Sequence, residues 1–140
     1  MRTTSDPELA SHLRFTLARA ARRLRQEAGT GLSPSLTAAL ASVERCGPLT
    51  PSELAAAERV RRPTITRVLA RLEDAGLISR TPDPADRRST LVAITPAGAG
   101  LLAEGRTRKD AFLSERLDGL FPADRETLAR AAAILEGLLE

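Results

Sequence analysis

The sequence is poor in the residues on which most enzymes and metalloproteins depend. It has one histidine, one cysteine, three phenylalanines and no tyrosine or tryptophan in 140 residues. Common catalytic and zinc sites need several histidine or cysteine groups converging on one point, so we expect no enzyme, no metal and no cofactor. Cys46 has no partner for a disulfide within the chain, and we expect it to be a small buried hydrophobic residue.

Long hydrophobic runs are also missing. No apolar stretch approaches the roughly 18 residues of a membrane-spanning helix, and no hydrophobic signal segment follows residues 1–7. We therefore expect a cytoplasmic protein without a membrane partner. The hydrophobic fraction of 42% is typical of a globular chain, and the length predicts a single domain over residues 1–140.

Lysine is nearly absent, because Lys109 is the only lysine among 21 basic residues. The arginines are unevenly placed. Residues 59–88 hold eight arginines and four acidic residues, a net charge of +4, whereas the whole chain carries +3. Arginine pairs in bidentate fashion with phosphate and guanine, so this basic block indicates a partner that is a polyanion.

Within this block, residues 63–75 have the pattern of an amphipathic helix. Pro63 suits a first helical turn and Gly76 suits a helix end. Four apolar residues fall on one face, at i, i+3, i+4 and i+7: Ile65, Val68, Leu69 and Leu72. The other face carries Pro63, Arg67, Ala70 and Asp74, flanked by Thr64, Thr66 and Arg71. This face indicates a nucleic-acid recognition helix, and the alternative is an ordinary solvated helix.

The neighbouring segments complete a helix-turn-helix with a wing. Residues 50–53 form a capping box that opens a short helix to about Ala57, and only about five residues separate it from the recognition helix. Two β-prone runs, 77–81 and 89–94, flank a turn-rich segment ending in Arg87 and Arg88. An arginine at this tip suits a minor groove. The alternative is a surface hairpin in which Asp83 or Asp86 pairs with Arg87 or Arg88.

The remaining segments predict long helices. They cover about 7–27, 34–45, 96–118 (despite its glycines) and 123–139. The fold class is mainly α (α+β), with a winged-helix DNA-binding region at 33–95. The apolar stripes of 7–28 and 96–140 exceed what the small winged unit covers, so we expect these helices to form a homodimer. Its two recognition helices would face a pseudo-palindromic site.

Several blocks of the chain resemble the MarR family of bacterial transcription regulators over nearly its whole length. The matching blocks are residues 31–35, 49–55, 62–67, 72–78, 83–88 and 91–98. The resemblance implies a winged-helix homodimer that binds operator DNA, usually as a repressor, and that often releases it when a small molecule or an oxidant acts. One departure lies in the turn before the recognition helix, where many relatives have an apolar residue and a glycine in place of Glu58 and Arg59.

The resemblance also implies roles for single residues. Pro63, Thr64, Thr66 and Arg67 match major-groove residues and Arg71 matches a backbone contact. Asp86 and Arg88 match the aspartate and arginine of the wing, with Arg87 as the alternative groove-inserting residue. The complete set that we assign to DNA is Arg62, Pro63, Thr64, Thr66, Arg67, Arg71, Asp86, Arg87 and Arg88.

An effector pocket is expected where the first, second and fifth helices meet, within reach of His12, Phe15 and Arg19. Oxidant-sensing relatives carry their cysteine in the first helix, so we do not extend thiol sensing to Cys46. An alternative function is a winged-helix module that binds protein or RNA without an operator. The scarcity of aromatic side chains disfavours an RNA reader, which stacks bases on such rings.

Overall fold

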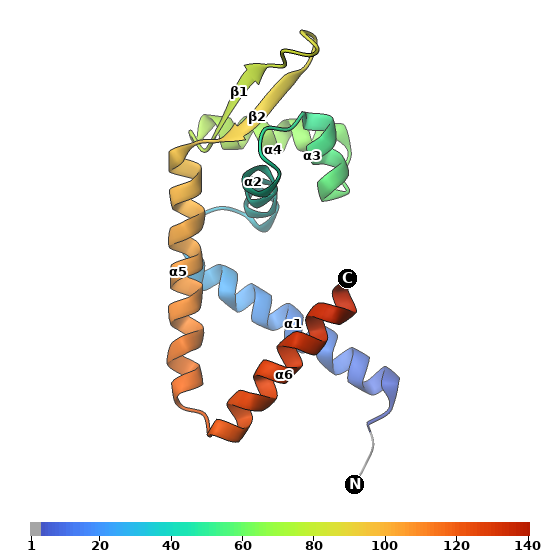
Figure 1. The fold of residues 1–140 in the computed structure, drawn as a ribbon, viewed down its shortest axis with the longest axis vertical. Coiled ribbons are helices and arrows are strands. Elements are labelled where there is room, and N and C mark those ends of the chain that lie inside the picture. The colour runs from blue at the N-terminus through green and yellow to red at the C-terminus, as the bar shows by residue number, and fades with distance from the viewer. Residues whose placement is uncertain (1–3) are drawn as a thin grey trace.

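The computed structural model describes residues 4–140, which form six helices and a small antiparallel sheet that lies at one end of the molecule (Figure 1). In chain order the elements are α1 (Asp6–Ala28), α2 (Pro34–Cys46), α3 (Pro51–Glu58), α4 (Arg62–Asp74), β1 (Ile78–Pro82), β2 (Thr90–Ile94), α5 (Pro96–Asp118) and α6 (Pro122–Leu139). The mainly α winged helix-turn-helix predicted from the sequence is confirmed.

Side-chain caps followed by proline fix where several helices begin. Thr50 is the clearest case: its hydroxyl accepts from the Glu53 N–H at 3.1 Å, and its own N–H donates to Glu53 Oε1 at 3.3 Å. α2 and α5 start in the same way, after Ser33 and Thr95. α1 begins after Ser5, whose N–H and hydroxyl both donate to Glu8 Oε2, which lowers the pKa of the Glu8 carboxyl group.

The winged unit has a hydrophobic core of its own. α2, α3 and α4 pack together beneath the sheet, and their largest side chains are almost fully buried: Leu40, Val43, Leu54, Ile65, Leu69 and Leu72. β1 pairs with β2 from Ile78↔Ile94 to Pro82↔Thr90. Leu49, ahead of α3, exchanges two backbone hydrogen bonds with Val92 of β2, at 2.8 and 3.1 Å. The sheet is thereby tied to the helix-turn-helix.

The long helices lie largely outside this core, to which α5 contributes Leu102. α5 descends from the sheet, α1 packs against its middle, and α6 turns back after Gly119 as a separate arm (Figure 1). α1 buries only Ala28, and α6 buries no residue at all. Over residues 4–140, no helix combines the length and apolar character needed to cross a membrane.

The expectation that Cys46 is buried is wrong, because its side chain is exposed. Cys46 is the last residue of α2, and the chain turns away there through Gly47, whose φ of 68° is left-handed. The residue keeps the helical spacing of the core positions Leu36, Leu40 and Val43 but lies at the end of the helix. The expectation rested on the usual burial of a free thiol, which does not hold for this residue at the end of a helix.

Candidate nucleic-acid interface

α4 separates its two faces sharply. Ile65, Leu69 and Leu72 are buried in the core of the winged unit. The side chains on its outer face are Pro63, Thr64, Thr66, Arg67, Ala70 and Arg71. All of them are exposed except Thr64, which is half-buried. The helix therefore presents hydroxyls, guanidinium groups and a small residue on one continuous outer surface, as its sequence pattern predicts.

Arg67 and Arg71 keep their charges available for a ligand. The ion pairs among residues 4–140 are Arg23–Glu27, Arg80–Glu73, Arg106–Glu44 and Arg108–Glu104, so neither arginine on the outer face of α4 is neutralised. Arg80 of β1 pairs with Glu73 of α4 at 2.5 Å. This pair fastens the first strand of the wing to the far end of the recognition helix.

Arg62 has a structural bond of its own. One guanidinium nitrogen donates to the Ser52 hydroxyl in the first turn of α3, and the Arg62 carbonyl accepts from the Thr66 hydroxyl at 2.9 Å. The side chain thus links the starts of the two helices of the motif. The Thr66 hydroxyl oxygen keeps its lone pairs and can still accept a hydrogen bond from a base.

The turn between α3 and α4 shows how the chain accommodates Glu58 and Arg59. Arg59 has a φ of 55°, a left-handed conformation that glycine adopts more easily, and its N–H donates to Ala56 O at 3.2 Å. Glu58 accepts a hydrogen bond from the buried hydroxyl of Ser42, which also accepts from Arg45 at 3.2 Å. A polar link from α2 thereby fixes this end of α3.

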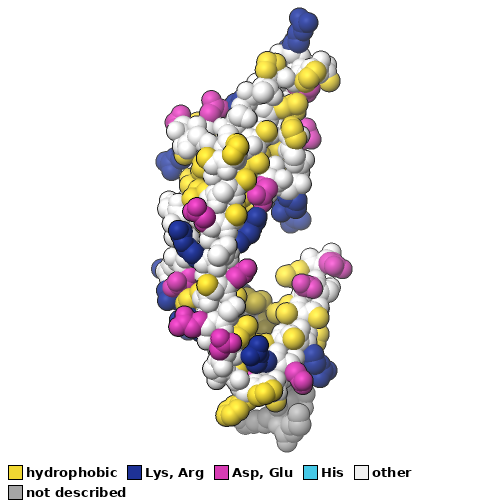
Figure 2. Space-filling view, turned by 60° about the vertical axis from the view of Figure 1, so that its left-hand side comes forward, with side chains coloured by type: hydrophobic (Ala, Val, Ile, Leu, Met, Phe, Trp, Pro, Cys, Tyr) yellow, Lys and Arg dark blue, Asp and Glu magenta, His cyan; other side chains and the backbone are white. Residues whose placement is uncertain are grey.

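The wing tip is held together by its two aspartates. Asp83 Oδ1 accepts from the Ala85 N–H at 2.9 Å, and Asp86 Oδ1 accepts from the Arg88 N–H at 3.0 Å. Within residues 4–140 neither carboxylate forms an ion pair with Arg87 or Arg88, and both arginine side chains are exposed. A basic side chain forms the outermost point of the hairpin (Figure 2). The plain surface ion pair weighed as an alternative is therefore absent from this tip.

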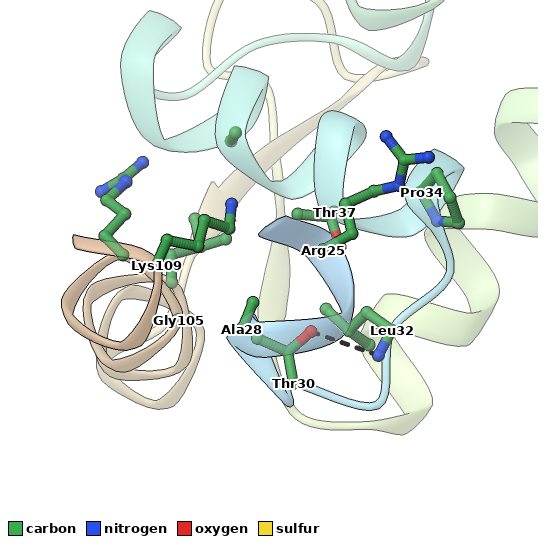
Figure 3. Close-up of a pocket in the computed structure, with 11 residues that line it drawn as sticks. Arg25, Ala28, Thr30, Leu32, Pro34, Thr37, Gly105 and Lys109 are labelled. Atoms are coloured by element: carbon green, nitrogen blue, oxygen red, sulfur yellow. Dashed lines mark hydrogen bonds between the residues drawn. The ribbon is translucent and has the colours of Figure 1, made fainter. Parts of the chain in front are cut away.

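A pocket lies where α1, α2 and α5 meet, at the place expected for an effector. Arg25, Thr30, Thr37, Arg106 and Lys109 provide its polar groups, and Leu32, Pro34 and Leu102 provide apolar lining (Figure 3). The structure does not bring His12, Phe15 or Arg19 to this pocket. They line a separate, open hollow on α1, where Arg19 lies over the Phe15 ring at 5.5 Å.

The sequence reasoning missed the residues that line this pocket. Thr30 and Leu32 lie in the loop between α1 and α2, and neither was among the residues expected at the pocket. In the structure Gly29 and Gly31 have left-handed φ values of 62° and 74°, and the Leu32 N–H donates to the Thr30 hydroxyl at 3.3 Å. The two glycines were the available signal, because they bend the chain from α1 toward α2 against α5.

Comparison with known proteins gives concordant results. The family model described as "MarR family" matches residues 32–90. An HTH-type transcriptional regulator of Mycobacterium tuberculosis is 38% identical over 137 residues, which cover 97% of this chain and 96% of that protein. The multiple antibiotic resistance protein MarR of Salmonella typhimurium is 36% identical over 101 residues, covering 72% of this chain and 66% of that protein.

Solved structures agree in fold. A crystal structure of a transcriptional regulator protein from Pseudomonas aeruginosa PA01 superposes with a TM-score of 0.88 at 35% identity, covering 99% of both chains. A mutant of MarR from E. coli, solved in complex with operator DNA, superposes with a TM-score of 0.69 at 25% identity and covers 94% of each chain. The likeness extends over the winged unit and the long helices together.

Proposed function

We propose that this chain, which belongs to the MarR family of DNA-binding winged-helix transcriptional regulators, is a cytoplasmic homodimeric repressor that binds a pseudo-palindromic operator and releases it when a small molecule binds. Membership in that family makes it a regulator rather than an enzyme.

The observation that carries the proposal is the outer face of α4. Arg67 and Arg71 are exposed and unpaired among the described residues, beside Thr64 and Thr66. Guanidinium and hydroxyl groups are the side-chain groups that read base edges and phosphates in a major groove. The E. coli MarR mutant solved with operator DNA has the same fold, which supports a similar use of α4 here.

Dimerisation is supported by apolar side chains that the single chain leaves uncovered. They gather on α1, the lower part of α5 and α6, and Figure 2 shows them along the arm formed by α6. They include Leu9, Phe15, Leu17, Leu113, Phe121, Leu128, Ile134, Leu138 and Leu139, each at least 42% exposed. Isolated chains rarely leave so much apolar surface in water, so we assign this surface to a second copy. A two-fold dimer then predicts two half-sites in the operator.

Ligand response is supported by the pocket between α1, α2 and α5. It joins the long helices to the first helix of the winged unit, so a bound molecule would touch both parts. Its lining combines apolar side chains with the cationic groups of Arg25, Lys109 and Arg106, the last of which pairs with Glu44. We infer that an occupant would change the angle between α5 and α2, and with it the spacing of the two recognition helices.

Selection of bound duplexes from a random DNA pool tests the proposal. We expect an enriched sequence with two inverted half-sites, whose affinity falls steeply with salt because bound phosphates release counterions. Enrichment of a site without inverted symmetry would contradict the dimer. No enrichment, with structured RNA or a protein binding instead, would favour an interaction module that does not use an operator.

A further inference from the structure

A second group of polar side chains lies beside the recognition helix, in a groove between the first turn of α2 and the outer face of α4. Ser33 and Ser35 line it from α2, and Thr64, Arg67 and Arg71 line it from α4. Leu36 and Val68 provide apolar lining. No residue of α2 belongs to the set assigned to DNA from the sequence. The groove therefore adds Ser35 to the interface.

Most polar side chains of the groove can donate hydrogen bonds and have no partner among residues 4–140. Within residues 4–140 the side chains of Ser35, Arg67 and Arg71 take part in no hydrogen bond or ion pair, whereas the Ser33 hydroxyl is occupied by the Leu36 N–H at 3.3 Å. No aspartate or glutamate lines the groove, and the first turns of α2 and α4 contain none. The groove therefore carries positive charge with no acidic side chain to balance it.

We propose that this groove holds a backbone phosphate of the bound operator, with the Ser35 hydroxyl and the Arg71 guanidinium donating to its oxygens. This inference rests on the proposed operator binding and adds a contact from a helix outside the helix-turn-helix. Phosphate oxygens only accept hydrogen bonds, which matches a site built from hydroxyl and guanidinium donors. A base edge is a poorer match, because bases also present donors that would need acceptors in the groove.

The contact has a geometric consequence. Ser35 belongs to α2, which packs against α4 through the core. A phosphate bound by both helices is therefore held at a fixed position relative to the α4 residues that enter the major groove of the DNA. Such contacts set the register and depth of a recognition helix without reading sequence. Ser35 is therefore a positioning residue, while Arg67 remains the reader of a base.

The duplex enriched from the random pool is the probe for this inference. Ser35→Ala should weaken binding about tenfold, to a similar degree on the enriched duplex and on a scrambled one, because a phosphate contact carries no sequence information. Ser35→Thr retains the hydroxyl and should bind within about twofold of the parent chain. Ser114→Ala, at an exposed serine of α5, is the matched control and should leave binding unchanged.

Duplexes with a single uncharged methylphosphonate, scanned along each strand, locate the contact. For the parent chain, binding should fall at one phosphate in each half-site, and this loss should be smaller for Ser35→Ala, which keeps only the Arg71 contact to that phosphate. Equal binding by Ser35→Ala and the parent chain, or an identical methylphosphonate profile for both, would overturn the inference while leaving operator binding intact. Absence of any enriched duplex would instead reject the proposed function. Thermal unfolding of each variant separates lost contacts from lost folding.

Discussion

Gly98 of α5 lies directly against the carbonyl of Leu77: a Cβ atom on Gly98 would stand 2.3 Å from the Leu77 oxygen and 2.8 Å from Ile94 Cγ1. The same carbonyl accepts from the Thr95 N–H at 3.0 Å, and the Thr95 hydroxyl donates to Gly76 O at 2.7 Å. The start of α5 is thus locked to the segment that ends α4. The orientation of the recognition helix relative to the long helices depends on this contact.

Replacing Gly98 by alanine should therefore destabilise the fold, because backbone atoms must move to admit the methyl group. We expect the free energy of unfolding to fall by about 1 to 3 kcal/mol, measured by urea denaturation. Gly100→Ala is the matched control. Apart from the neighbouring backbone of its own helix, no atom of residues 4–140 lies within 4 Å of a Cβ at this exposed glycine, so alanine there should stabilise by about 0.5 to 1 kcal/mol. Equal effects of the two substitutions would contradict the close packing at Gly98.

The sequence predicted the helices and strands but not the contacts between distant segments. Cap, proline and periodicity located every helix and both strands to within about two residues, since those signals are local. The close approach of Gly98 to Leu77 is a contact between two segments far apart in the sequence, and no local pattern predicts it. The bond between Arg62 and Ser52, and the distance of His12 from the pocket between α1, α2 and α5, likewise depend on tertiary structure. For this reason the residues of the pocket were misassigned.

Arg59 offers a second test, because it occupies a left-handed position that glycine favours. Arg59→Gly should raise the free energy of unfolding by up to about 1 kcal/mol, since the strain of a side chain at positive φ is removed. Arg59→Ala keeps that strain and serves as the control. Urea denaturation of both variants gives the comparison. A glycine variant no more stable than the alanine variant would show that the turn holds Arg59 without strain.

The two free arginines of α4 should differ in what they contribute to operator binding. Arg67→Ala should lower specific affinity by about 1 to 3 kcal/mol and relax one base position in each half-site, if Arg67 reads a base. Arg71→Ala should weaken binding evenly across sequences and reduce the slope of log affinity against log salt by about 1 for each half-site. Binding titrations over a salt series, on the enriched duplex and its single-base variants, distinguish the two roles. Unchanged sequence preference in Arg67→Ala would remove Arg67 from base reading.

For the removal of the Asp86 side chain, charge and geometry predict opposite changes in DNA affinity. Its carboxylate accepts from the Arg88 N–H and shapes the wing tip. Asp86→Ala should therefore weaken DNA binding, although it removes a negative charge near the phosphates. Asp86→Asn keeps an oxygen acceptor without the charge and should bind at least as well as the parent chain. Tighter binding by Asp86→Ala would show that the carboxylate acts only through its charge.

Arg87→Ala and Arg88→Ala, measured in parallel, identify which arginine makes the wing contact.

The uncovered apolar stripe of α6 makes the dimer testable without disturbing the winged unit. Ile134 and Leu138, one turn apart, are 61% and 70% exposed, and α6 buries no residue within the single chain. The double substitution Ile134→Glu, Leu138→Glu should therefore leave the folded monomer intact and abolish dimerisation, because two carboxylates would lose their hydration at the interface. Sedimentation should then give a 15.0 kDa species, and binding to a two-half-site duplex should fall to that of a single half-site.

Ala133→Glu places the same charge on the opposite side of α6 and should remain dimeric. A dimeric double variant would move the interface away from α6, toward the apolar residues of α1.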